Sequence, residues 1–92
     1  MDQAALKMQK SLNRALDAAG KMIGNGNSVD FRPDIRKSQD QWEDWKETQC
    51  NLEADVTMGS AGAYVLPQCR ERLIIERTKS LDDIAGQLEG LL

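Results

Sequence analysis

Apolar residues recur at spacings of three and four along most of this 92-residue chain, and only two short stretches interrupt the pattern. Such spacings place apolar side chains on one face of an α-helix. The first run predicts a helix over about residues 2–23. Its apolar face is expected to comprise Ala5, Met8, Leu12, Leu16, Ala19 and Ile23.

The first interruption is the stretch GNGNS at residues 24–28, where two glycines accept the left-handed backbone angles that end a helix. Pro33 followed by Asp34 is typical of a first helical turn. Proline lacks only an N–H that has no partner there, and the carboxylate favours the positive end of the helix dipole. A second helix is therefore expected over about residues 33–56. Its inward face is predicted to comprise Ile35, Gln39, Trp42, Trp45, Gln49, Leu52 and Val56.

The second interruption is the stretch MGSAGA at residues 58–63, and Pro67 is again placed for a helix start. A third helix is expected over about residues 65–90, with an apolar face of Leu66, Leu73, Leu81, Ile84, Leu88 and Leu91. The nearest strand-like segment, residues 63–66, is too short to support a sheet. We therefore expect one all-α domain over residues 1–92, a three-helix antiparallel up-and-down bundle with its apolar faces turned inward.

Charge and composition exclude several classes of function. Fifteen acidic and twelve basic side chains give a net charge of −3, which offers no electrostatic basis for binding nucleic acid or an anionic membrane surface. The apolar runs are far shorter than the roughly 20 residues that span a membrane. The chain has no histidine, which removes most zinc sites and any histidine general base. We expect neither an enzyme nor a bound cofactor.

The charges are unevenly distributed between the second and third helices. Residues 40–55 carry six acidic side chains and one lysine, a net charge of −5, whereas residues 70–79 are net +2. Two helices with these charges are predicted to attract each other as they pack. An acidic face on the second helix is either a solvated surface or a docking patch for a basic protein; it is formed by Asp40, Glu43, Asp44 and Glu47.

Cys50 and Cys69 are the two cysteines of the chain. If the second helix ends near Val56 and the third begins near Leu66, they lie roughly 9 and 6 Å from the turn, at similar heights. Facing Cα atoms on packed helices approach to about 4–6 Å, which permits a disulfide. We expect a disulfide between these helices, contributing about 3 kcal/mol in the chain-entropy description. Two free buried thiols in a cytosolic protein are the alternative.

Two sequence segments carry a resemblance to a known family. The first is IRKSQDQWEDWKETQC at residues 35–50, and the second is ERTKSL at residues 76–81. Their order and spacing, with the intervening acidic residue, glycine turn and second cysteine, resemble the LprI-like lysozyme-inhibitor family, formerly a domain of unknown function. The matching residues are Arg36, Gln39, Trp42, Trp45, Lys46, Cys50, Glu53, Gly59, Gly62, Cys69, Arg77, Thr78 and Leu81, preceded by Leu12 and Asn13.

The sequence departs from the family pattern at three points. Leu16 stands where the family usually has tyrosine, Trp45 stands where tyrosine is frequent, and a further cysteine pair found in many members is missing. The resemblance implies a periplasmic or secreted bacterial domain that inhibits lysozyme through protein binding. Because the start of the chain lacks the pattern of a signal peptide, we expect either a cytosolic protein or an exported domain whose leader has been removed.

The sequence also predicts roles for individual side chains. Trp42 and Trp45 are expected in the core, because large aromatic residues supply much of a thin core. Arg77 lies on the apolar face of the third helix, where we expect it to pair with a carboxylate of the second helix or with backbone carbonyls. The candidate carboxylates are Glu47, Glu53 and Asp55.

The second turn supplies candidate anchors for a partner. Met58 and Tyr64 flank its glycines, and loops on a rigid scaffold often carry binding residues. The partner implied is a basic, lysozyme-like wall hydrolase. Two other interpretations remain open: a structural or stress-related envelope protein that binds a partner helix or itself, and a cytosolic regulatory module with free thiols.

Overall fold

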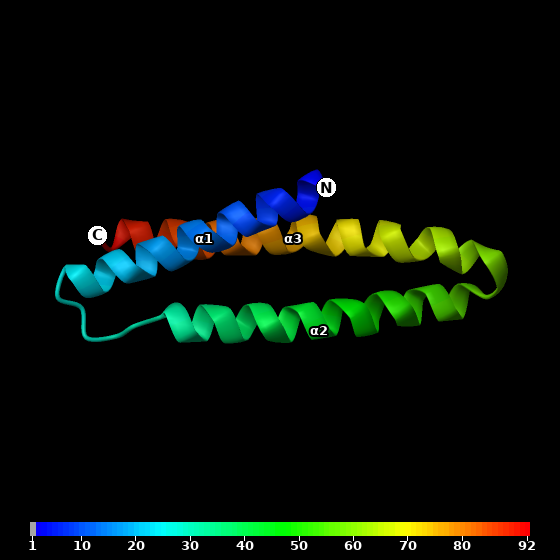
Figure 1. Ribbon diagram of the computed structural model, residues 1–92, viewed down its shortest axis with the longest axis horizontal. Helices are drawn as coiled ribbons and strands as arrows, with labels where there is room; N and C mark the ends of the chain where they lie inside the picture. Colours follow the sequence, from blue (N-terminus) through cyan, green and yellow to red (C-terminus); the bar gives the residue numbers. More distant parts are fainter. Residues whose placement is uncertain (1) are drawn as a thin grey trace.

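The computed structural model describes residues 2–92 as three α-helices and one short 3₁₀ turn. The elements are α1 (Gln3–Gly24), α2 (Arg32–Thr57), η1 (Gly59–Ala61) and α3 (Gly62–Gly90) (Figure 1). α1 and α3 run in one direction and α2 runs in the other. The expected all-α up-and-down bundle is confirmed, and its dimensions of 56 × 21 × 19 Å make it an elongated rod.

The helix boundaries agree with the expected ones to within one residue for α1 and α2, whereas α3 begins three residues early. Pro67 therefore lies inside α3, and the expectation that it starts the helix is wrong. Proline here removes the N–H that would bond to the carbonyl of Ala63, four residues before. Ala63 is exposed beside the turn, where water can bond to that carbonyl, so the helix tolerates the loss.

Local contacts define both ends of α1. The Asp2 carboxylate accepts a hydrogen bond from the backbone N–H of Ala4 at 3.0 Å and caps the first turn. At the other end, Gly26 adopts a φ of 91°, and the N–H of Asn27 bonds back to the carbonyl of Met22 at 3.0 Å. The glycine-containing break therefore ends α1 as the sequence predicts.

The start of α2 is held by a side-chain cap just before it. Pro33 and Asp34 occupy its first turn, as expected. The Asp30 carboxylate accepts hydrogen bonds from the Arg32 guanidinium at 2.8 and 2.9 Å and from the Arg32 backbone N–H at 3.0 Å. These bonds lower the pKa of Asp30 to about 2, so this carboxylate is ionised at neutral pH.

α1 packs on the C-terminal part of α3 largely through small side chains. Ala15, Ala18 and Ala19 of α1 are almost fully buried with Ala85 of α3. Small side chains allow two helix axes to approach closely, because the interaxial distance follows the size of the contact residues. The buried face of α1 is therefore rotated slightly from the expected one. Leu12 and Leu16 are only partly buried, and the buried set is Met8, Ser11, Ala15, Ala18, Ala19 and Met22.

The expected apolar face of α3 largely forms the core. Leu73, Leu81 and Leu88 are buried, and Leu66 and Ile84 are partly buried against neighbouring clusters. Ile74 is buried as well and packs with Met8 of α1. Leu91 follows the end of α3 and is exposed, contrary to expectation.

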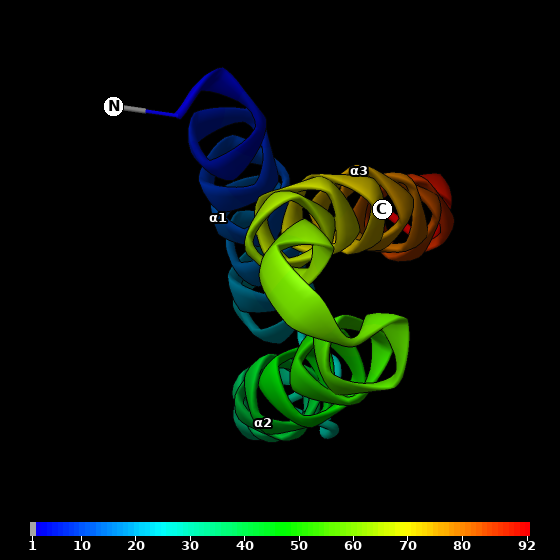
Figure 2. The same cartoon turned by 90° about the vertical axis from the view of Figure 1, so that its right-hand side faces the viewer.

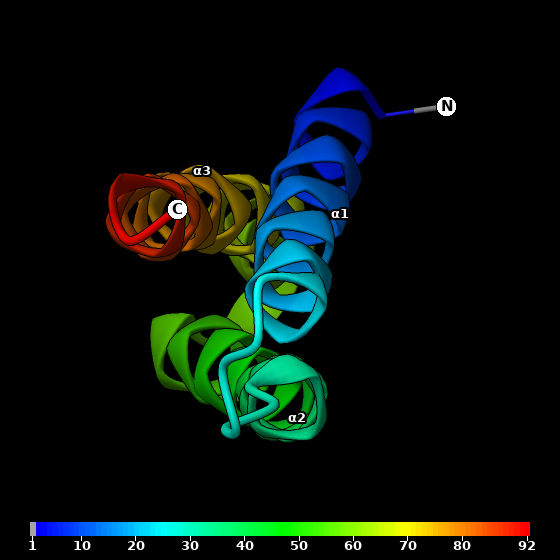
Figure 3. The ribbon, with the colours of Figure 1, turned by 90° about the vertical axis from the view of Figure 1, so that its left-hand side faces the viewer.

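α1 covers only part of the hairpin that α2 and α3 form (Figure 1). In the end-on views the three helices lie at the corners of a triangle, with α1 inclined to the other two (Figure 2, Figure 3). Ala4, in the first turn of α1, packs in the cluster that contains Ile74. The next cluster toward the turn, around the two cysteines and Leu73, includes no described residue of α1. We call residues 47–72, the part of the hairpin beyond α1, the arm.

Three apolar residues expected in the core lie on the surface instead. Trp45 is 49% exposed, and Leu52 and Val56 are more exposed still. Two helices bury only the side chains directly between them, and α1 does not reach far enough to cover the neighbouring flank of α2. Trp42 does pack against the core, in contact with the clusters on both sides of it, so the expectation holds for one tryptophan and fails for the other.

Candidate partner-binding surface

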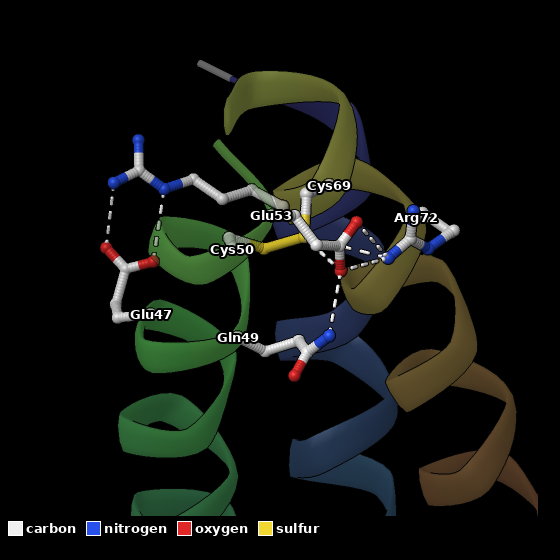
Figure 4. The surroundings of a disulfide bond; sticks show 7 residues. Glu47, Gln49, Cys50, Glu53, Cys69 and Arg72 are labelled. Atoms are coloured by element: carbon white, nitrogen blue, oxygen red, sulfur yellow. Dashed lines mark hydrogen bonds and ion pairs between the residues drawn. A yellow bond between two sulfur atoms is a disulfide. The ribbon is translucent and has the colours of Figure 1, made fainter. Parts of the chain in front are cut away.

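A disulfide joins the two helices of the arm. Cys50 of α2 and Cys69 of α3 are bonded, their Cα atoms are 5.5 Å apart, and both side chains are buried (Figure 4). The expected pairing is confirmed, and the alternative of two free thiols is wrong. A structural disulfide fits an oxidising compartment.

Two arginine–glutamate ion pairs flank the disulfide on opposite sides (Figure 4). Arg70 donates to both carboxylate oxygens of Glu47 at 3.0 and 3.1 Å, and Arg72 donates to both oxygens of Glu53 at 2.8 and 3.1 Å. These bonds lower the pKa of both carboxyl groups, with a further bond from Gln49 to Glu53. The predicted attraction between the acidic and basic segments is therefore confirmed. Glu47, a member of the expected acidic face, is engaged in it through its ion pair with Arg70.

Arg77 has neutral partners rather than a carboxylate. Its Nε donates to Oε1 of Gln39 at 2.9 Å and its second terminal nitrogen donates to the Ser38 hydroxyl at 3.0 Å. The expected ion pair with Glu47, Glu53 or Asp55 is wrong, because those residues lie farther along α2, in the arm. Burial lowers the pKa of the Arg77 guanidinium, and the Glu43 carboxylate partly opposes this.

Two cations lie over the Trp42 ring. The Lys46 Nζ is 5.2 Å from the ring centroid and the Arg77 Cζ is 5.9 Å from it. Lys46 also forms an ion pair with Glu43 at 3.0 Å, and Glu43 accepts a bond from Gln39. Four residues of the family resemblance, Gln39, Trp42, Lys46 and Arg77, thus form one polar layer between α2 and α3.

The other residues of the resemblance have local positions. The Thr78 hydroxyl donates to the Ile74 carbonyl one turn earlier in α3 at 2.8 Å. Arg36 lies near the start of α2 and is exposed. Gly62 lies where α3 approaches α2 closely, since a Cβ at this position would stand 2.9 Å from the Ala54 carbonyl oxygen. Of these three residues, Gly62 is the one that bears on the packing of α2 against α3.

The acidic face of α2 is smaller than the sequence suggests. Of its four expected members, Glu43 and Glu47 are engaged in ion pairs. Asp40 and Asp44 are exposed, and within residues 2–92 their carboxylates have neither an ion pair nor a side-chain hydrogen bond. Asp55 shares this state, and its spacing from the other two places it on the same side of α2. We call Asp40, Asp44 and Asp55 the acidic row.

The turn at the end of the arm presents apolar side chains to solvent. Met58, which follows α2, is 79% exposed and is the one non-glycine residue between positions 2 and 92 with a positive φ, at 61°. Tyr64 in the first turn of α3 and Val56 in the last turn of α2 are also exposed. The arm thus brings the two predicted anchors to one end of the molecule and adds Val56, which sequence reasoning assigned to the core. We call residues 56–64 the tip.

Two further properties bear on what this surface can do. None of the helices described is both long and apolar enough to cross a membrane. Across residues 2–92, no three side chains from cysteine, aspartate and glutamate gather closely enough to hold a metal ion. The candidate surface consists of a line of carboxylates along α2 and an apolar tip on an arm that is fixed by the disulfide.

Comparison with known proteins gives one match. The family model described as "Lysozyme inhibitor LprI" matches residues 1–81, which include α1, α2, the disulfide and α3 as far as Leu81. No curated protein and no solved structure matches the chain.

Proposed function

We propose that this chain, which belongs to the LprI lysozyme-inhibitor family, is an exported protein-binding domain that inhibits a lysozyme-like wall hydrolase. The observation that carries the proposal is the family match over residues 1–81 of 92. The family is one of inhibitor domains, so the proposed activity is binding rather than catalysis.

The disulfide supports the proposed location. Bonds of this kind persist in the periplasm and outside the cell and are rare in the reducing cytosol. The bond between Cys50 and Cys69 is fully formed and buried inside the arm. The disulfide therefore supports the proposal of a periplasmic or secreted domain, which would meet enzymes that cleave the cell wall.

The acidic row supports the proposed partner. Asp40, Asp44 and Asp55 are exposed on one side of α2 and are not neutralised by any basic residue of the described chain. Lysozyme-like enzymes are commonly basic, and opposite charges accelerate encounter and fix orientation. Such steering weakens as salt screens it over a Debye length of about 10 Å at 0.1 M.

The test is inhibition of wall lysis by the purified, oxidised protein against lysozymes of several structural types, at low and moderate salt. We expect inhibition of at least one basic enzyme, with a slower association rate as salt rises. Asp40→Asn/Asp44→Asn should slow association several-fold. The matched control is Asp17→Asn/Asp83→Asn, which removes the same charge from exposed positions on α1 and α3. If a stoichiometric excess inhibits none of the enzymes, the proposal is wrong.

The exposed flank of α2 favours a second candidate function. Trp45, Leu52 and Val56 lie along one side of that helix and are all exposed. Such a surface suits an envelope protein that packs against a partner helix or a second copy, without inhibiting an enzyme. Sedimentation at increasing protein concentration tests this candidate: concentration-dependent association that Leu52→Ser abolishes would support it, and a monomer throughout would exclude self-packing.

A further inference from the structure

The shape of the arm indicates how it would engage the enzyme, given the proposed function on which this rests. The arm projects beyond α1, so its two helices and the tip are surrounded by solvent over most of their circumference (Figure 1, Figure 2). The tip forms one end of a rod 56 Å long and about 20 Å across. A projection of this kind can enter a groove that the body of the bundle cannot.

The tip is slender because its side chains are small. Between Met58 and Tyr64 the sequence is Gly-Ser-Ala-Gly-Ala. Gly62 sits against the Ala54 backbone, where even a methyl group would meet the carbonyl oxygen at 2.9 Å. The close approach keeps α2 and α3 together up to the turn. Met58 and Tyr64 are therefore the two long side chains of a narrow tip, and Met58 is the one that lies between the helices, in the turn itself.

Met58 occupies a backbone conformation that its side chain disfavours. Its φ of 61° and ψ of 141° lie in a region that residues with a Cβ rarely enter, and such strain is concentrated at functional sites. Glycine would fit this position without strain. A methionine there, exposed to 79%, places a flexible apolar side chain in the solvent at the end of the arm.

The charges of the arm are arranged in two zones. Residues 56–66 contain no charged side chain. Behind them, the rest of the arm (residues 47–55 and 67–72) carries four acidic and two basic side chains. Both arginines are paired with glutamates, which leaves Asp55 and Glu71 without an ion pair in the described chain. The uncharged tip and the net negative charge of the rest of the arm are complementary to a groove that has catalytic carboxylates at its floor and basic residues at its rim. Enzymes that hydrolyse glycosidic bonds generally use two such carboxylates.

The arm is also rigid before it binds. The disulfide fixes the distance between α2 and α3, and the Glu47–Arg70 and Glu53–Arg72 pairs hold the helices on both sides of it (Figure 4). A surface that is ordered in advance loses less conformational entropy on binding. We propose that the arm is a preformed plug, and that the tip enters the polysaccharide-binding groove of the basic hydrolase and excludes the glycan chain.

The plug is tested by the inhibition kinetics and by variants at Met58. A plug in the substrate groove predicts competitive inhibition, also when a short soluble oligosaccharide replaces the cell wall as substrate. Met58→Gly removes the side chain at a position whose backbone suits glycine, and Met58→Asp adds a charge that the catalytic carboxylates would repel. We expect each to raise the inhibition constant at least tenfold, with Met58→Asp having the larger effect.

The matched control is Leu91→Ser, which changes a side chain of similar exposure after the end of α3 and should leave the inhibition constant unchanged. Helix content and the absence of free thiols would establish that each variant is folded. Inhibition that is non-competitive, or that spares the soluble substrate, or that survives both Met58 changes, would overturn the plug while leaving the inhibitor function standing. If the native protein inhibits no enzyme at all, the proposed function fails, and the plug fails with it.

Discussion

The Nε of Arg77 donates a hydrogen bond to Oε1 of Gln39 at 2.9 Å across the interface of α2 and α3. Gln39 is only 7% exposed, so this amide has little access to water and depends on the guanidinium to satisfy its oxygen. The amide nitrogen reaches the Glu43 carboxylate at 3.3 Å and the Met8 sulfur at 3.7 Å. One buried glutamine thus connects all three helices at the middle of the rod.

Removing either partner of this bond should destabilise the fold. Arg77→Met leaves the Gln39 oxygen buried without a donor, and a buried polar group without its partner costs about 1–3 kcal/mol. Gln39→Met should cost a similar amount, because the guanidinium loses its acceptor. The double variant places two apolar side chains in contact and should lose less than the sum of the single changes. Urea unfolding of the four proteins measures this coupling, and strictly additive losses would show that the bond contributes nothing.

The sequence predicts the helices of this protein well because helical periodicity and turn residues are local properties. GNGNS and MGSAGA end α1 and α2 where they are expected to, and Pro33 lies in the first turn of α2. The position of Cys50 opposite Cys69 follows from the same local geometry, since it depends only on the number of residues between each cysteine and the turn.

The surface is less predictable because it depends on which helix covers which. α1 has 22 residues and α3 has 29, and the shorter helix packs at the C-terminal part of the longer one, away from the turn. Nothing in the pattern of α2 shows which part of its flank lacks a third neighbour, so Trp45, Leu52 and Val56 look like core residues in the sequence. The partner of Arg77 is not predictable from the sequence for a related reason. Charge alone favours a carboxylate, whereas the register of α2 against α3 places Gln39 beside the guanidinium.

The disulfide should matter most in the arm. Replacing both Cys50 and Cys69 by alanine releases a cross-link with a sequence separation of 19 residues, which should lower the free energy of unfolding by about 3 kcal/mol. Because α1 does not cover the arm, we expect the backbone amides of residues 47–72 to lose more protection against hydrogen exchange than the amides where α1 packs on α3. A uniform loss across all helices would show instead that the arm unfolds only together with the rest.

The ion pairs of the arm should make stability depend on pH. Arg70 and Arg72 lower the folded-state pKa of Glu47 and Glu53, whereas in the unfolded chain these groups titrate near 4.3. The stabilisation is therefore present above about pH 4.3 and is lost as the pH falls through the lowered folded-state pKa values. The urea midpoint should fall on acidification, and Glu47→Gln/Glu53→Gln should reduce the size of that fall.

A matched control isolates this pH effect. Glu71→Gln/Glu76→Gln removes two exposed glutamates of α3 that form no ion pair within residues 2–92. This variant should keep the wild-type dependence of the urea midpoint on pH. If both double variants respond to acid as the wild type does, the ion pairs do not account for the acid sensitivity, and other carboxyl groups with lowered pKa values, such as Asp30 and Glu89, carry it.

Two glycines of α3 provide an internally matched test of how closely the helices of the arm approach. Gly86 faces open space, with no neighbouring side chain or helix within 4 Å of where a methyl group would stand, so Gly86→Ala should stabilise the protein by roughly 0.5–1 kcal/mol through helix propensity alone. Gly62→Ala has the same benefit in principle, but its methyl group would stand 2.9 Å from the Ala54 carbonyl oxygen, a backbone atom that cannot move without displacing α2.

We expect Gly62→Ala to be destabilising and to speed amide exchange in the last turn of α2, while Gly86→Ala leaves exchange there unchanged. Thermal unfolding of both variants beside the wild type decides the matter, and equal stabilisation by the two alanines would show that the arm can widen freely at its tip.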